Sequence, residues 1–149
     1  MRVEDAVNAA RAAFEKGVVA GGGVALLSLA PELERLADTL VGDERTGARI
    51  AAEALRAPII RIVENAGAPG RVVVEKLAEM DAGSGYDAAT GTYVDLFEQG
   101  IIDPVRVTRS ALEAAFSVAQ TLLVTEAGVT AVKGEAKSLA EAFHVGGAR

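Results

Sequence analysis

The sequence predicts a mainly α fold with several helices and one small β-hairpin. Apolar residues recur at spacings of three and four over most of the chain, which is the period of one helix face. Half of the residues are hydrophobic but only 4% are aromatic, so the core is expected to consist mainly of Ala, Val, Leu and Ile. The helical pattern changes at a glycine-rich stretch, residues 81–95, part of which is typical of a hairpin.

The first helix is predicted over residues 3–16, followed by a short extended link at Gly17 to Val19. Acidic residues in its first turn and Lys16 in its last complement the helix dipole, and Gly17 is a suitable stop. The apolar stripe of this helix comprises Val3, Val7, Ala10 and Phe14.

Three consecutive glycines, Gly21 to Gly23, follow the extended link. Glycine loses more backbone freedom on folding than any other residue, so three in a row require a reason. One interpretation is a tight turn, which the residues by themselves favour. The other is backbone that a second chain segment or a ligand approaches closely.

The middle of the chain is predicted to be helical. A buried helix is expected over Val24 to Ala30, ending at Pro31, and an amphipathic piece follows. A long helical pattern covers residues 44–65, where Pro58 should kink or divide it. Another helix opens at Gly70.

The last third mixes element types. A hairpin is expected over 86–94, and Asp103 followed by Pro104 is a strong signal for an N-cap and the first helical residue. The remaining expected elements are a short helix at Asp95 to Gln99, a long helix that opens at Pro104, a strand at 125–133, a helix at 138–143 and a fraying tail.

Composition excludes several classes of function. The net charge of −6 and pI of about 4.8 argue against a surface that neutralises nucleic-acid phosphates. The chain has no cysteine, no apolar run of the ~20 residues that span a bilayer, and no signal-peptide pattern. We therefore expect no nucleic-acid partner, no membrane association and a cytoplasmic location.

Conventional catalytic signatures are also absent from the sequence. There is no phosphate-binding G-x-x-x-x-G-K-[ST] loop, and the single histidine, His144, cannot form a paired metal site. Asp5 reads as a helix-dipole carboxylate, although an aspartate there can orient a water. Asp103 is explained as an N-cap, although a carboxylate at an element junction can accept hydrogen bonds from sugar hydroxyls.

Four segments stand out when they are taken in chain order. They are Arg2-Val3-Glu4-Asp5-Ala6, Gly17-Val18-Val19-Ala20-Gly21-Gly22-Gly23-Val24-Ala25-Leu26, Gly85-Tyr86-Asp87-Ala88-Ala89-Thr90 and Asp103-Pro104-Val105-Arg106-Val107-Thr108-Arg109-Ser110-Ala111-Leu112. Together with Thr125-Glu126-Ala127 they resemble the C-terminal part of group I chaperonins of the GroEL type. The last of the four strings is highly specific.

The resemblance implies three regions. Residues 1–16 would be the last helix of the intermediate domain, 17–133 the C-terminal half of the equatorial ATPase domain, and 134–149 a C-terminal tail. The complete protein would be an ATP-driven folding machine of stacked rings. Its implied partners are other chaperonin subunits in a homo-oligomer, non-native protein substrates and a co-chaperonin.

The resemblance also implies site residues. Asp5 would be the catalytic carboxylate, which positions or activates the attacking water when the intermediate domain closes. The implied nucleotide-binding positions are Gly22, Asp87, Ala88, Ala89 and Asp103. Their roles suit the chemistry: glycine lets a nucleotide lie against backbone, small side chains line the adenine, and the Asp103 carboxylate binds the ribose.

Several departures from the family pattern limit what this chain is expected to do. Asp87 stands where asparagine is common, and Lys16 stands where an acidic residue is frequent. No segment matches the N-terminal equatorial half, which carries the phosphate and magnesium loops, or the apical domain. ATP and Mg²⁺ are therefore expected cofactors of the complete protein, and no metal ligand is assigned to this chain.

Two hypotheses follow from these observations. In the first, the chain is a fragment of a chaperonin subunit that contributes part of an ATP pocket and is a poor ATPase by itself. In the second, it is a helical scaffold or self-associating module that keeps the fold without the chemistry, because exposed apolar faces become interfaces.

Overall fold

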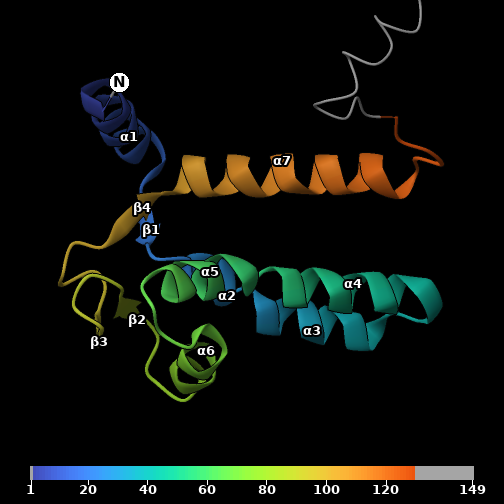
Figure 1. Cartoon of the computed structure of the whole chain (residues 1–149), viewed down its shortest axis with the longest axis horizontal. Helices are drawn as coiled ribbons and strands as arrows, with labels where there is room; N and C mark the ends of the chain where they lie inside the picture. Colours follow the sequence, from blue (N-terminus) through green and yellow to red (C-terminus); the bar gives the residue numbers. More distant parts are fainter. Residues whose placement is uncertain (1, 130–149) are drawn as a thin grey trace, which may run out of the picture. The chain divides into compact units, whose positions relative to one another are not determined.

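The computed structural model describes residues 2–129, and the chain divides into two units, residues 1–113 and 114–149. The described part is mainly helical with two small antiparallel sheets, which confirms the predicted fold class (Figure 1). In chain order its elements are α1 (Arg2–Lys16), β1 (Val18–Ala20), α2 (Val24–Leu27), α3 (Ala30–Thr39), α4 (Gly42–Ala54), α5 (Ala57–Asn65), α6 (Gly70–Ala78), β2 (Ser84–Asp87), β3 (Thr92–Asp95), β4 (Ile102–Pro104) and α7 (Val105–Leu123). None of the described helices has both the length and the apolar character needed to cross a membrane.

Helix α1 confirms the predicted first helix, and it ends as expected. Gly17 has a φ of 82° and its N–H donates to the Ala13 carbonyl at 2.8 Å, the pattern of a C′ glycine. The apolar stripe is largely uncovered within the described chain, because Val3 is 77% and Phe14 94% exposed.

The prediction of one helix from Val24 to Ala30 is wrong. Helix α2 ends at Leu27, and Pro31 lies in the first turn of α3, which begins at Ala30. The proline lacks the N–H that a continuous helix would donate to the Leu27 carbonyl, but the first turn of a helix needs no such bond. Pro58 divides α4 from α5 in the same way, as predicted.

Helices α3 and α4 pack side by side (Figure 1). Ala37 on α3 is fully buried and Ala52 on α4 is 1% exposed, so small side chains allow the two helices to approach closely. Arg49 pairs with Asp38 across this contact at 3.2 Å.

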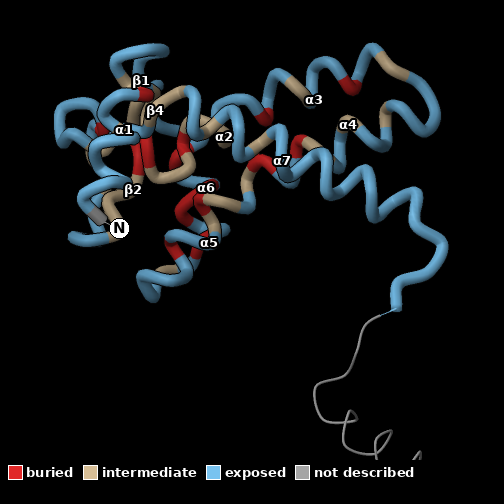
Figure 2. The backbone as a smooth tube through the Cα atoms, turned by 90° about the horizontal axis from the view of Figure 1, so that it is seen from above, coloured by how far each residue is buried: buried red, intermediate tan, exposed pale blue. Residues whose placement is uncertain are grey.

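The main apolar core lies where α2, α5 and α6 meet the hairpin of β2 and β3 (Figure 2). Its buried members are Val24, Ile59, Val63, Val73, Val74, Leu77 and Leu96. The hairpin confirms the predicted one, with Tyr86 opposite Tyr93 in its register. Leu96 lies just after β3 and is fully buried.

A second sheet was not predicted. The expected extended link is strand β1, and it pairs antiparallel with β4, so that Val19 lies opposite Asp103. Asp103 is therefore a strand residue, and the predicted N-cap at this position is wrong. Helix α7 begins one residue later than expected, and the Val105 N–H donates to the Gly17 carbonyl at 3.2 Å.

Two further expectations differ from the structure. Residues 96–100 form turns instead of a helix, although the Asp95 carboxylate accepts from the N–H groups of Phe97 at 2.8 Å and Glu98 at 3.0 Å, as an N-cap would. Gly100, with a φ of 69°, ends the segment. The strand expected at 125–133 is absent from its described part, 125–129, while the helix at 138–143 and the tail lie outside the described residues.

The fully buried position of Leu96 generates a stability prediction. We expect Leu96→Ala to lower the free energy of unfolding by about 3 kcal/mol, because it removes buried apolar surface and leaves a cavity. The matched control is Leu36→Ala, whose side chain is 51% exposed. Urea unfolding followed by circular dichroism measures both changes, and equal losses would contradict the described core.

Candidate functional site

The glycine bend, defined as Gly21 to Gly23, joins β1 to α2 and lies at the centre of the candidate site. Gly22 and Gly23 have φ angles of 61° and 81°, a backbone region that L side chains rarely adopt. The Gly21 N–H donates to the Ile101 carbonyl at 2.9 Å. Among residues 2–129, no carbonyl or side chain accepts a hydrogen bond from the N–H of Gly22 or Gly23.

The three glycines of the bend have different surroundings. A Cβ at Gly21 would lie 3.0 Å from the Ile101 carbonyl oxygen, and a Cβ at Gly23 would lie 2.8 Å from the Ile59 nitrogen. At Gly22 the nearest atom is the Tyr86 carbonyl oxygen, at 3.9 Å. Close approach by other chain segments thus explains Gly21 and Gly23, whereas the position beside Gly22 is open.

The hairpin turn next to the glycine bend is ordered by Asp87. Its carboxylate accepts from the Thr90 hydroxyl at 2.7 Å and from the Ala89 N–H at 2.9 Å. These two hydrogen bonds, the hydroxyl first, hold the pKa of Asp87 below its ordinary value. Ala88 is half-buried and Ala89 exposed, so the turn presents small side chains.

The described contacts bring several of the predicted nucleotide residues together. The glycine bend meets β2 at Tyr86, one residue before Asp87, and meets Ile101 and Ile102 just before Asp103. Asp103 is exposed on β4. The bend therefore lies between the two segments that carry the predicted aspartates.

No described contact brings Asp5 to the glycine bend. The C-terminal end of α1 lies beside the start of α7, where the exposed carboxylate of Glu15 pairs with Arg106 at 2.9 Å. Asp5 is ten residues earlier, about 15 Å along the helix axis. Within residues 2–129, no hydrogen bond or ion pair joins its carboxylate to the glycine bend, the hairpin or β4.

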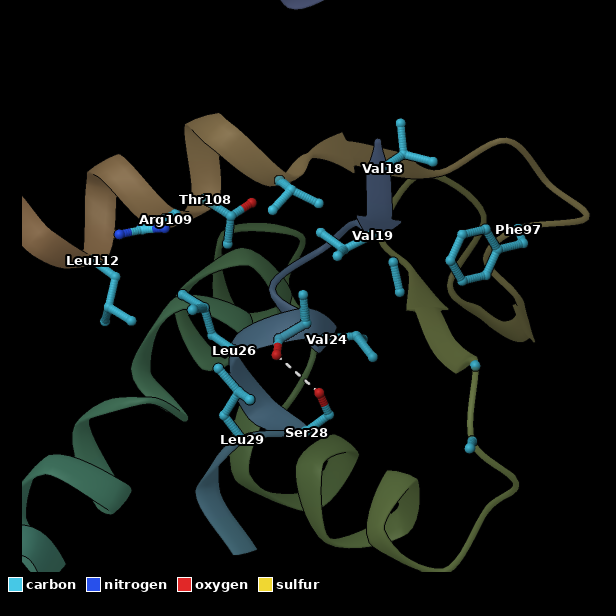
Figure 3. Close-up of a pocket in the computed structure, with 15 residues that line it drawn as sticks. Val18, Val19, Val24, Leu26, Ser28, Leu29, Phe97, Thr108, Arg109 and Leu112 are labelled. Carbon is cyan, nitrogen blue, oxygen red and sulfur yellow. Dashed lines mark hydrogen bonds between the residues drawn. The ribbon is translucent and has the colours of Figure 1, made fainter. Parts of the chain in front are cut away.

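An apolar groove of about 550 Å³ lies beside β1, and sequence reasoning missed it. It is formed by β1, α2 and the first turns of α7, with Val19, Leu26 and Leu112 among its side chains (Figure 3). None of the predicted site residues lines it. Its residues come from 18–29, 82–83, 97 and 105–112, which are distant in sequence, so no local pattern could have revealed it.

Comparison with known proteins identifies the family. Residues 1–133 match the TCP-1/cpn60 chaperonin family. The chain belongs to this family. The prediction of a chaperonin is thus confirmed at family level, while its assignment to group I stays a prediction.

Two solved chaperonins are similar in fold. One is an open-state monomer of a group II chaperonin from Methanococcoides burtonii, with a TM-score of 0.67 and 29% identity over 72% of this chain. The other is a group III chaperonin in the open state, with a TM-score of 0.72 and 32% identity over 79% of this chain. The matched regions span only 28% and 25% of those two chaperonins.

The unequal surroundings of the glycines generate a second prediction. Gly22→Ala should lower the free energy of unfolding by about 1–2 kcal/mol, the cost of the left-handed backbone. Gly23→Ala should cost about 3 kcal/mol or more, because its methyl group also meets the backbone of Ile59. Urea unfolding of both variants tests this order, and a larger loss at Gly22 would refute it.

The lowered pKa of Asp87 gives a pH-dependent prediction. A carboxyl group with a lower pKa in the folded state adds stability above its unfolded pKa and loses it as pH falls through the folded pKa. The difference in melting temperature between the unsubstituted chain and Asp87→Ala should therefore be constant above about pH 5 and shrink below about pH 4. Thermal unfolding across this range measures it, and a difference that grows in acid would contradict the hydrogen bonds assigned to Asp87.

Proposed function

We propose that the chain forms one wall of the ATP pocket in a chaperonin subunit that assists protein folding within a ring assembly. The observation that carries this proposal is the placement of the glycine bend. It lies between the hairpin and the segment before Asp103, and Gly22 leaves space beside backbone N–H groups that have no partner among the described residues. Free N–H groups in a left-handed bend attract anionic oxygens such as those of a phosphate.

The remaining implied residues fit a nucleotide in chemical character. The exposed Asp103 carboxylate can accept hydrogen bonds from the two ribose hydroxyls. Ala88 and Ala89 offer small side chains to a flat base. Because the carboxylate of Asp87 is occupied within the turn, we assign it the role of shaping the adenine side of the pocket.

Magnesium is a cofactor of the complete subunit in this proposal. Among residues 2–129, no three acidic or histidine side chains gather in a group able to hold a metal ion. The metal-binding loop is therefore assigned to another part of the subunit. When bound, the metal would neutralise phosphate charge, while this chain's residues would bind the base and sugar and offer the N–H groups of the glycine bend to a phosphate oxygen.

Asp5 is proposed as the catalytic carboxylate that orients the attacking water. In the described arrangement no hydrogen bond or ion pair joins it to the glycine bend, and α1 is proposed to move for Asp5 to act. Gly17, at the junction of α1 and β1, has a φ of 82° and suits a hinge because glycine has more backbone freedom than other residues. The chain by itself is expected to hydrolyse ATP poorly, since transition-state charge is left uncompensated.

The group I assignment rests on the Asp-Pro-x-x-Val-Thr-Arg-Ser-Ala-Leu string at residues 103–112. The group I assignment also implies a cytoplasmic homo-oligomeric ring, non-native protein substrates and a separate co-chaperonin. Reconstitution of the complete subunit with a group I co-chaperonin tests this assignment. Folding activity that needs no co-chaperonin would contradict it.

A second candidate function is a self-associating helical module without catalytic chemistry. The exposed apolar stripe of α1 favours it, because Val3 and Phe14 have no cover in the described chain. Size-exclusion chromatography with light scattering distinguishes this alternative. An oligomer that neither binds nor responds to ATP would support it over the first proposal.

Nucleotide affinity tests the principal proposal directly. We expect ATP to bind with weak affinity and Asp103→Ala to reduce that affinity about five- to tenfold, because a ribose hydrogen bond to a charged group is lost. Isothermal titration calorimetry with ATP and Mg²⁺ measures this. The matched control is Asp81→Ala, another exposed aspartate outside the proposed pocket. Equal effects of the two substitutions would refute the ribose assignment.

A further inference from the structure

The hairpin beside the glycine bend is held in place by contacts of residues that have no role in the proposed nucleotide pocket. Each of its strands has only four residues, and a two-stranded hairpin of this size is marginally stable without support. On its inner side, Gly85 lies so close to Leu96 that a Cβ would come within 2.4 Å of the leucine side chain. That contact ties the hairpin to the apolar core.

A second support of the hairpin, besides the contact of Gly85 with Leu96, comes from two tyrosines and a lysine. Tyr86 and Tyr93 are cross-strand neighbours whose rings meet edge to face, with centroids 5.4 Å apart and an angle of 70°. The Lys76 Nζ atom lies 4.2 Å from the centroid of the Tyr93 ring, which is the geometry of a cation–π interaction. We call these three residues the lysine–tyrosine clamp.

The clamp connects a rigid element to the candidate site. Lys76 is on α6, which is anchored in the core by Val73, Val74 and Leu77. At the other end of the clamp, the carbonyl of Tyr86 is the atom nearest to the open side of Gly22. Any shift of the Tyr86 backbone therefore changes the space beside Gly22 and moves Asp87, the next residue.

We propose that Lys76 and Tyr93 are positioning residues for the candidate nucleotide site. By holding the Tyr93 ring against Tyr86, Lys76 fixes the hairpin backbone at the spacing from Gly22 that an adenine nucleotide requires. This inference rests on the proposed function for its ligand, while the clamp itself is a property of the hairpin and α6. Neither residue is proposed to touch the nucleotide.

The test uses two readouts on the full chain. Amide hydrogen exchange of Gly85 and Asp87, which lie at the hydrogen-bonded positions of the hairpin ladder, is measured without nucleotide and reports whether the hairpin is held. Isothermal titration calorimetry with ATP and Mg²⁺ reports the effect on binding. Lys76→Met removes the charge but keeps the long stem, and we expect it to speed exchange and weaken ATP affinity about two- to fivefold each.

Matched variants separate positioning from general destabilisation. Lys76→Arg keeps a cation over the ring and should restore both values, and Tyr93→Phe should behave as the unsubstituted chain, whereas Tyr93→Leu should resemble Lys76→Met. Lys16→Met, which makes the same charge change on exposed α1, should leave both values unchanged.

The outcomes distinguish this inference from the function on which it rests. Exchange in Lys76→Met that equals exchange in Lys16→Met would overturn the clamp. Faster exchange with unchanged ATP affinity would overturn its positioning role. Faster exchange in a chain that binds no ATP in any form would refute the proposed function and leave the clamp established as the support of the hairpin.

Discussion

The close packing of backbone around Gly21 and Gly23 is the constraint on which the rest of the first unit depends. At these two positions the chain passes so near Ile101 and Ile59 that a β-carbon cannot be accommodated without movement of backbone. This contact fixes the turn from β1 into α2, and it brings β4 and α5 to the same place. Without this contact, nothing in the bend would hold the segments that carry Asp87 and Asp103 close to each other.

From this bend the packing extends in two directions. Toward α5 and α6, aliphatic side chains form a core in which Ile59, Val63 and Leu96 are essentially inaccessible to water. Toward α7, the β1–β4 pair is short, and the backbone bond from Val105 to Gly17 joins the start of α7 to the end of α1. The elements that surround the candidate site are therefore supported by the core on one side and by a small sheet on the other.

Much apolar surface is left without cover in the described chain. The stripe on α1 presents Val and Phe side chains to solvent, and the groove beside β1 presents Val and Leu side chains. Such surface is characteristic of polypeptide that packs against further protein. This agrees with a match that spans about a quarter of the length of two solved chaperonins, and it explains why helices with clear apolar faces contain few buried residues.

The sequence by itself determined the local elements whose signals act within a few residues. Gly17 ends α1, Pro58 separates α4 from α5, and the alternation before and after Thr90 and Gly91 produces the hairpin. Only the tertiary structure decided what depends on distant partners. Asp103 satisfies the local rule for an N-cap, yet strand pairing with Val19 takes its backbone into β4 instead. The triple glycine could be a turn or a site of close approach, and it is both, because Ile59 and Ile101 come from elsewhere in the chain. Local propensity depends only on residues that are near in the chain. Strand pairing and close packing depend on segments that are far apart in the chain, and the sequence does not say which of these segments meet.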